Sequence, residues 1–207
     1  LGIGFEPVSS MKCRAIPALV VCLAMVACAK KPGEGGSAAE VSTENGATAL
    51  SELATQGWAR VSADLVDAKG ASVGVVLIRA GAAGVMMRLD AAGLTPGWHG
   101  VHFHAVGDCS DGAAGFKKAG AHFNAMKREH GLLHEGGSES GDLPNVFAGA
   151  DGRARAELFR AGLALTGDGG LMDADGFAVV IHAGADDHQS QPIGGAGERV
   201  ACAAVRG

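Results

Sequence analysis

Short apolar runs alternate with turn-forming clusters of Gly, Asp and Pro from residue 58 onward. The runs are enriched in β-branched residues and recur about every dozen residues, which is typical of antiparallel strands joined by hairpins. We predict strands at 59–66, 72–78, 85–89, 146–148, 153–159, 177–182 and 200–205. About eight strands in all, with no long helical periodicity, predict an all-β sandwich or barrel.

Two long stretches, 107–144 and 183–197, carry almost no strand pattern and are rich in Gly. Gly supplies 34 of the 207 residues, which favours tight turns and irregular loops and argues against a helical bundle. Loops of this length in a compact domain usually carry function. We therefore expect two long functional loops on a strand scaffold.

The N-terminal region has the pattern of a secretory signal at 11–27, with Lys12 and Arg14 before an apolar run. That run is about 15 residues, shorter than the ~20 that a permanent membrane-spanning helix needs. Residues 25–28, Met-Val-Ala-Cys, resemble the bacterial lipobox, which predicts a lipid on Cys28. A permanent anchor and a soluble protein after cleavage are the alternatives. We interpret residues 1–10 as a start-site artefact.

Residues 28–56 are rich in Gly, Ala, Ser, Glu and Lys and contain few large apolar side chains, which predicts a flexible tether. One globular domain follows at 57–207. The whole chain has a net charge of −5 and shows no stripe of basic residues that could neutralise a phosphate backbone. This argues against a nucleic-acid partner. Of the five cysteines, Cys109 and Cys202 lie in the domain and remain as a candidate disulfide pair in an oxidising compartment.

All eight histidines follow residue 98, in or beside the two long loops. His102 and His104 are two residues apart, so in a strand their side chains share one face while Val101 and Phe103 pack on the other. A single strand histidine is more often an ordinary core residue. Two imidazoles on one face, with further histidines downstream, favour a metal site.

Several spaced motifs between residues 58 and 205 match a known family in its own order. They are GVHFH at 100–104, GDC at 107–109, AGAHFN at 119–124, GDLPN at 141–145, VIH at 180–182, DD at 186–187 and GAGERVAC at 195–202. On these residues the domain resembles copper/zinc superoxide dismutase of the bacterial secreted type.

The resemblance implies a Greek-key, immunoglobulin-like β-sandwich or barrel with copper and zinc as cofactors. It implies an enzyme that converts superoxide to dioxygen and hydrogen peroxide, for antioxidant defence in the periplasm or cell envelope. The superoxide anion would be the partner, membrane contact would come only through the N-terminal lipid, and the chain would be a monomer or a homodimer. A storage or delivery module for copper and zinc with little turnover is the alternative function.

By the same resemblance, the copper ligands are His102, His104, His122 and His182. His122 would bridge copper and zinc, and Arg199 would be the active-site guanidinium, which makes these two the catalytic residues. Asp186 matches a carboxylate that links a copper histidine to a zinc histidine. Cys109 and Cys202 match the family disulfide.

The zinc ligands match less completely. His122, His130 and Asp142 stand at family positions, but Glu139 stands where a third histidine is expected. We expect Glu139 to bind zinc through oxygen, with His134 as the other candidate and a weakened or empty site as a further alternative.

Charge also bears on how the substrate would arrive. Without residues 1–27, 15 basic and 21 acidic residues leave a net charge of −6, which repels superoxide at long range. Local positive charge must then attract the anion. Candidates in the loop that carries His122 are Lys117, Lys118, Lys127 and Arg128, although each could equally be an ordinary solvated side chain.

Overall fold

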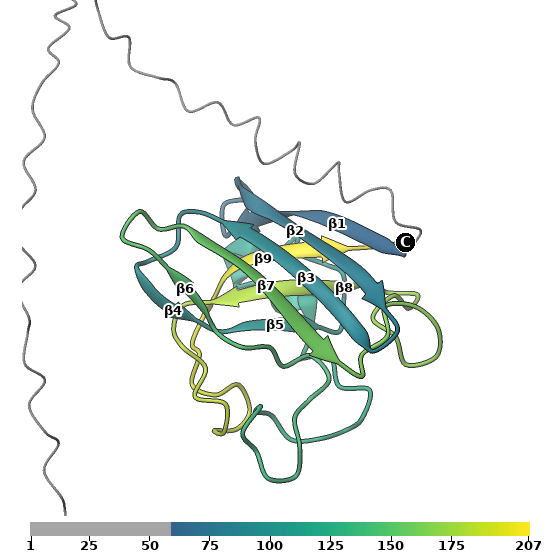
Figure 1. Ribbon diagram of the computed structural model, residues 1–207. Helices are drawn as coiled ribbons and strands as arrows, with labels where there is room; N and C mark the ends of the chain where they lie inside the picture. Colours follow the sequence, from purple (N-terminus) through teal and green to yellow (C-terminus); the bar gives the residue numbers. More distant parts are fainter. Residues whose placement is uncertain (1–58) are drawn as a thin grey trace, which may run out of the picture. The chain divides into compact units, whose positions relative to one another are not determined.

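The computed structural model describes residues 59–207, and Figure 1 shows these residues in colour. The predicted signal at 11–27, the lipidation site Cys28 and the tether lie outside the described residues. Nine strands and two short 3₁₀ turns occur in the described part. They are β1 Arg60–Asp67, β2 Ser72–Gly81, β3 Gly84–Ala91, β4 Gly97–His99, β5 Val101–His104, η2 Gly112–Ala114, η3 Lys117–Ala119, β6 Val146–Ala148, β7 Ala154–Ala161, β8 Phe177–His182 and β9 Arg199–Val205.

All strand pairs are antiparallel and build one curled sheet of seven strands in the order β5-β8-β9-β1-β2-β3-β7. Its two end strands, β5 and β7, are brought together by a second, two-stranded sheet of β4 and β6 (Figure 1). Gly100 alone separates β4 from β5, and β6 contacts β7. The small sheet thus closes the large one, which leaves few unprotected strand edges.

The main hydrophobic core lies inside this closed sheet. Leu65, Ile78, Met87, Phe103 and Phe177 are among its fully buried members. Their strands alternate in burial, as a sheet with one face inward requires; in β3, for example, buried and intermediate residues alternate from Val85 to Ala91. The core therefore supplies a rigid scaffold from which the loops project.

A second apolar cluster lies between the sheet and the loop that carries η2 and η3. Phe116 and Ala119 of that loop pack with Ala178, Val180 and Cys202 of β8 and β9. This packing holds the loop against the sheet close to the end of β5.

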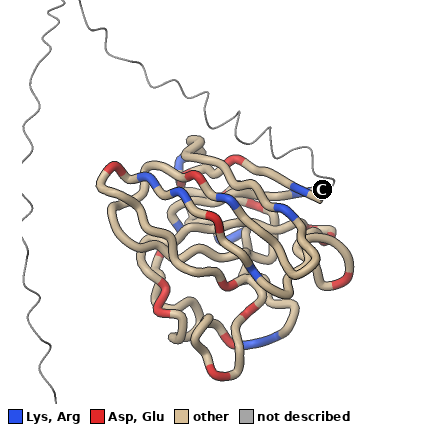
Figure 2. The backbone as a smooth tube through the Cα atoms, in the orientation of Figure 1, with Lys and Arg blue, Asp and Glu red and all other residues tan. Residues whose placement is uncertain are grey.

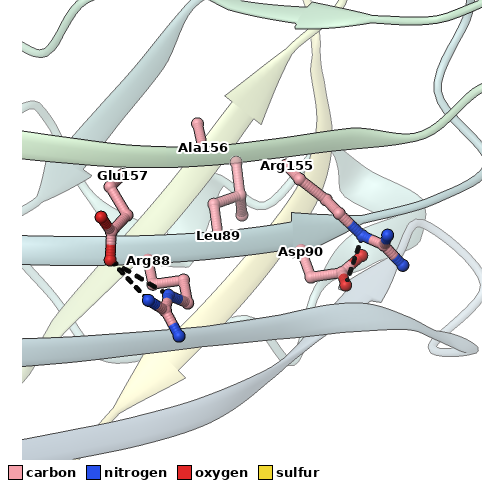
Figure 3. A pocket seen from close by; sticks show the side chains of 6 residues that line it. All are labelled: Arg88, Leu89, Asp90, Arg155, Ala156 and Glu157. Atoms are coloured by element: carbon pink, nitrogen blue, oxygen red, sulfur yellow. Dashed lines mark hydrogen bonds and ion pairs between the residues drawn. The ribbon is translucent and has the colours of Figure 1, made fainter. Parts of the chain in front are cut away.

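The outer face of β3 and β7 carries two cross-strand ion pairs beside a shallow hollow (Figure 3). Arg88 Nη2 lies 2.7 Å from Glu157 Oε1, and Arg155 Nε lies 2.9 Å from Asp90 Oδ2. The two residues of each pair lie directly opposite each other on the two strands, and all four side chains are partly exposed. Over the described residues, basic and acidic positions are interspersed along the strands (Figure 2).

The predicted fold class is confirmed, and each predicted strand range overlaps an observed strand. The segment with His102 and His104 contributes two strands, β4 and β5, because the chain turns at Gly100 from the small sheet into the large one. The two long loops are also confirmed: between residues 105 and 145 the chain forms only η2 and η3, and it forms no strand between 183 and 198. Within residues 59–207, no helix has the length and apolarity needed to cross a membrane.

Candidate metal centre

Strand β5 presents two buried histidines on one face. His102 and His104 alternate with Val101 and Phe103, and all four residues are fully buried. Phe103 packs edge-on against Phe177 in the main core at 5.7 Å between ring centroids. The core side of β5 thus fixes the direction in which the two imidazoles point.

Two backbone hydrogen bonds attach the long loop to β5 at Phe103, and a third joins the two loop segments that meet there. Phe103 N–H donates to Gly141 O at 2.9 Å, Phe123 N–H donates to Phe103 O at 2.8 Å, and Gly141 N–H donates to Phe123 O at 2.7 Å. A Cβ at Gly141 would lie 2.4 Å from Phe103 O, so only glycine permits this approach. The junction places the neighbours His122 and Asp142 directly opposite His104 and His102.

Four buried histidines form the first cluster: His102, His104, His122 and His182. Each offers one ring nitrogen, and these atoms all lie within 4.8 Å of one another. They are Nδ1 of His102 and Nε2 of the other three, and none of the four has a hydrogen-bond partner. Buried polar atoms are normally paired, so four converging unpaired nitrogens need a ligand.

The opposite nitrogen of each ring has a partner. His102 Nε2 lies 2.8 Å from Asp186 Oδ2, and His122 Nδ1 lies 2.7 Å from Glu139 Oε2. His104 Nδ1 lies 3.0 Å from the carbonyl of Gly120, and His182 Nδ1 lies 3.1 Å from that of Gly197. A carbonyl accepts only an N–H, so the rings of His104 and His182 carry their proton on Nδ1 and leave a lone pair on Nε2.

Burial keeps three of these rings neutral. It lowers the pKa of His102 to about 4, although the hydrogen bond to Asp186 opposes the shift. Burial also lowers the pKa of His182 to about 3 and holds the pKa of His104 well below its ordinary value, with neighbouring cationic groups acting in the same direction. Neutral imidazole is the form that binds a metal.

The second cluster joins His102 and His122 to His130 and Asp142, all of them buried. His130 Nδ1 lies 2.9 Å from Asp142 Oδ1, and His122 Nδ1 lies 3.6 Å from the same oxygen. Burial lowers the pKa of His130, but its hydrogen bonds with Asp142, Asp186 and Glu139 outweigh burial and raise that pKa to about 11. Burial favours protonated Asp142, yet His122 and His130 hold its pKa far below the ordinary range.

Glu139 lies beside this second cluster, although it is not a member of the group itself. Its Oε2 lies 2.7 Å from His122 Nδ1 and 3.4 Å from His130 Nδ1. Burial raises the pKa of Glu139, but hydrogen bonds from the two histidines lower it overall, so the side chain is a carboxylate. His134 lies elsewhere: it belongs to neither cluster, and its Nε2 lies 2.9 Å from Oε2 of the exposed Glu129.

Asp186 connects the two clusters. Its Oδ2 lies 2.8 Å from His102 Nε2, and its Oδ1 lies 3.1 Å from His130 Nε2. A Cβ at position 194 would lie 1.7 Å from that Oδ1 with φ at +60°, so the second loop needs Gly194 here. The two histidines on which the carboxylate acts come from different parts of the chain, and Asp186 orients both rings.

Two amide side chains join the two long loops here through paired hydrogen bonds with the backbone. Asn145 Nδ2 donates to Asp186 O at 2.8 Å and Asp186 N–H donates to Asn145 Oδ1 at 2.9 Å. Gln191 forms the same kind of pair with the backbone of His130, at 2.8 and 3.0 Å. The sequence analysis did not identify Gln191, because a glutamine in a Gly-rich loop carries no local signal.

Two histidines outside the clusters also have defined places. His99 is buried, and its ring nitrogens lie 2.6 and 2.8 Å from the carbonyls of His182 and Thr95, so it contacts backbone. His188 is partly buried, and its Nδ1 lies 3.3 Å from Asp186 Oδ2. The turn at Asp186, whose Oδ1 accepts from His188 N–H, draws that ring inward.

Arg199 begins β9 and lies at the edge of the four-histidine cluster. Its Nη1 donates to Phe116 O at 2.6 Å and its Nη2 donates to Gly120 O at 2.8 Å. These carbonyls flank η3, so the guanidinium is fixed beside Lys117 and Lys118, which are both exposed. Burial lowers the pKa of Arg199, and the side chain stays cationic.

Cys109 and Cys202 form a disulfide, with 5.8 Å between their Cα atoms. The bond ties the η2–η3 loop to β9 only three residues from Arg199. Disulfides persist in oxidising compartments, so this one fits a protein outside the cytosol.

Comparisons with known proteins agree with this geometry. The family model described as copper/zinc superoxide dismutase (SODC) matches residues 72–205. A Cu-Zn superoxide dismutase of Caulobacter vibrioides is 50% identical over 141 residues, which cover 66% of this chain and 80% of the relative. A second relative, Cu-Zn superoxide dismutase 1 of Aquifex aeolicus, is 35% identical over 150 residues, which cover 71% and 88%.

Solved structures agree as well. A superoxide dismutase-like protein from Bacillus subtilis has a TM-score of 0.66 and 32% identity, covering 72% of this chain and 99% of that one. The Cu/Zn superoxide dismutase of Brucella abortus has a TM-score of 0.59 and 27% identity, covering 71% and 99%.

Three observations agree: the curled antiparallel sheet, the two clusters of metal-ligand type, and the family match over most of the described residues. The predicted enzyme class and its cofactors, copper and zinc, are thereby confirmed, and the storage alternative is set aside. The chain belongs to the copper/zinc superoxide dismutase family of oxidoreductases.

Proposed function

We propose that this chain dismutates superoxide with copper held by His102, His104, His122 and His182. The observation that carries the proposal is the set of four buried, unpaired ring nitrogens that converge within 4.8 Å. Four imidazole nitrogens suit a cupric ion, which favours nitrogen donors. The partners on the opposite nitrogens orient each ring.

Zinc would be held by His122, His130, Glu139 and Asp142. His122 has an unpaired Nε2 toward the first cluster and a Nδ1 toward the two carboxylates, which supports a bridging imidazolate. His130 Nδ1 and Asp142 Oδ1 are likewise buried, and they face each other at 2.9 Å without good hydrogen-bond geometry. Two nitrogens and two oxygens form a ligand set that zinc accepts in tetrahedral geometry.

When bound, copper supplies one-electron transfer, so two superoxide ions and two protons give one dioxygen and one hydrogen peroxide. The residues of this chain orient the metal ligands, attract the anion, exclude water and supply a proton. Arg199 attracts the anion with a fixed cation, and burial of the histidines excludes bulk water from the site. His122 would take up a proton at Nε2 and release it to the reduced product.

The copper assignment is tested with His104→Ala. We expect this variant to lose both copper and superoxide dismutation, because it removes one of four converging donors. His134→Ala is the matched control, since it removes a histidine outside both clusters. Full activity in His104→Ala, with copper measured on the same sample, would exclude the assignment.

The zinc ligands are tested with Glu139→Ala and the same His134→Ala variant. We expect zinc to be lost from Glu139→Ala and retained by His134→Ala. The reverse result would make His134 the fourth ligand. A wild-type protein that contains copper alone would remove the zinc site from the mechanism.

The cellular setting we propose is the bacterial envelope, where the enzyme would remove superoxide as an antioxidant defence. The disulfide supports an oxidising compartment, and the signal-like residues 11–27 support export. The lipobox-like run before Cys28 supports a lipid anchor.

A further inference from the structure

Arg160 is a charged residue in an inward-facing row of β7. Strand alternation places Ala154, Ala156, Leu158 and Arg160 on one side and leaves Arg155, Glu157 and Phe159 exposed on the other. Figure 3 shows the exposed pairs that Arg155 and Glu157 form with β3. Arg160 has no part in them, and it is partly buried at the end of its row.

Its guanidinium binds three consecutive residues of the long loop. Arg160 Nη2 donates to Glu139 O at 2.6 Å and to Ser138 Oγ at 2.8 Å, and its Nε donates to Ser140 O at 3.1 Å. The planar guanidinium has several N–H donors in a fixed arrangement and can make all three hydrogen bonds at once. A lysine ammonium cannot reproduce this set of contacts. Arg160 thereby fixes the backbone of segment 138–140 against the sheet.

The side chain of Glu139 is held from the other direction. Asn124 Nδ2 donates to Glu139 Oε1 at 3.0 Å, which leaves Oε2 facing His122 Nδ1. The backbone N–H of Glu139 donates to Asp142 Oδ2 at 3.0 Å. Each polar group of Glu139 therefore has an assigned partner, and one carboxylate oxygen alone points at the second cluster.

Charge gives a second reason for an arginine here. Glu139 places a second negative charge next to that of Asp142, because carboxylate oxygens of both residues face His122 Nδ1. Besides His130, which lies 2.9 Å from Asp142, Arg160 of β7 places a positive charge at segment 138–140. Burial lowers the pKa of Arg160 and Asp142 raises it, so the guanidinium and this carboxylate attract each other. A cation at position 160 lowers the cost of placing two carboxylates side by side.

We propose that Arg160, assisted by Asn124, is a positioning residue of the zinc site that holds Glu139 where its Oε2 can bind the metal. The inference rests on the proposed role of Glu139 as a zinc ligand. It explains how a carboxylate can serve as a ligand at position 139: Arg160 anchors the backbone that carries it, and Asn124 leaves Oε2 free to face the second cluster.

The test uses the full chain with Arg160→Lys, Arg160→Met and Asn124→Ala. Zinc affinity is measured by competition with a chelator, and the visible absorption of Co²⁺ bound in place of zinc reports the ligand geometry. We expect zinc affinity to fall about 10- to 100-fold in both Arg160 variants, the usual cost of removing a group that orients a ligand. The Co²⁺ spectrum should change, and Arg160→Lys should not restore it.

Two measurements separate positioning from general stability. Arg155→Met changes an arginine on the exposed side of the same strand and should leave zinc affinity and the Co²⁺ spectrum unchanged. Copper affinity at the four-histidine cluster should also stay within about twofold in the Arg160 variants, because Arg160 contacts only segment 138–140. If Arg160→Met does not fold, Arg160→Lys and Asn124→Ala carry the test on the same terms.

The inference would be overturned if the Arg160 variants kept wild-type zinc affinity and an unchanged Co²⁺ spectrum. If Glu139→Ala lost zinc in the same experiment, the proposed ligand set would remain intact. Retention of zinc in Glu139→Ala would instead overturn the ligand assignment and this inference with it. Equal loss of zinc and copper affinity in Arg160→Lys would show a general structural effect and also overturn it.

Discussion

His104 and Arg199 bind the same backbone carbonyl. Gly120 O accepts a hydrogen bond from His104 Nδ1 at 3.0 Å and another from Arg199 Nη2 at 2.8 Å. The shared acceptor holds a fixed cation next to a histidine of the four-histidine cluster. The orientation of His104 and the proposed attraction of superoxide by Arg199 therefore depend on the same turn of the long loop.

Replacing Arg199 should slow superoxide dismutation while leaving copper in place. We expect Arg199→Met to lower the rate about 10-fold or more, because a cation focused at a site raises the on-rate of an anion by 10- to 1000-fold. The rate of Arg199→Lys should lie between those of the wild type and Arg199→Met, because lysine keeps the positive charge but lacks the planar guanidinium with its several donors. The assay is the rate at several salt concentrations, and the variant should show a weaker salt dependence.

The matched control is Arg155→Met, which removes the same charge from the outer face of the sheet. An Arg199→Met enzyme as fast as the wild type would contradict the steering role. A loss of copper equal to the loss of rate would assign Arg199 to ligand orientation instead.

Removal of the disulfide should destabilise the domain and loosen the loop that holds Arg199. Cys109 and Cys202 are 93 residues apart in sequence. The chain-entropy estimate for such a loop is about 4.7 kcal/mol, and typical measured gains are about 2 to 4 kcal/mol. For a domain of this size we expect the Tm of a double serine variant to fall by about 10 °C. Calorimetry of metal-free samples measures this, and a Tm within about 2 °C of the wild type would contradict it.

The stability of the metal-free protein should peak near pH 6.5. The pKa of His102 is lowered to about 4 and that of His182 to about 3, so between pH 6.5 and 4 the unfolded chain takes up protons that the folded chain does not. Stability therefore falls as the pH falls through that range. The pKa of His130 is raised to about 11, so above pH 6.5 the unfolded chain releases a proton that the folded chain keeps, and stability falls again.

Urea unfolding of chelator-treated protein from pH 5 to pH 9 measures this profile. With both metals bound, the ligands no longer titrate freely, and the profile should be flatter. A free energy of unfolding that rises steadily up to pH 9 in the metal-free protein would exclude the proposed effect of His130.

Cys28 should tether the full-length protein to a membrane. We expect the wild type in the membrane fraction and Cys28→Ser in the soluble fraction, because stable anchoring needs two or more acyl signals and a bacterial lipoprotein carries them on this cysteine. Cys22→Ser is the matched control, since Cys22 lies within the predicted signal. A wild-type protein that is already soluble would contradict lipidation.

The strand scaffold and two members of the four-histidine cluster could be predicted from the sequence. Strand geometry is local and repeats every two residues, so the alternation in β5 was enough to place His102 and His104 on one face. The spaced motifs then identified His122, His182, Asp186 and Arg199 through resemblance to a family. These residues lie where their motifs indicated, around one site.

The way in which the loops complete the second cluster could not be predicted from the sequence and depends on long-range contacts. The meeting of His130, Glu139 and Asp142 depends on backbone hydrogen bonds between Phe103 and residues of a long loop, and no local pattern encodes such pairings. The same holds for Arg160, which looks like one more charge on a strand until the loop at 138–140 folds onto it. Side chains that act across long stretches of chain gain their role from loop closure, so their function follows from the folded structure and not from their neighbours in sequence.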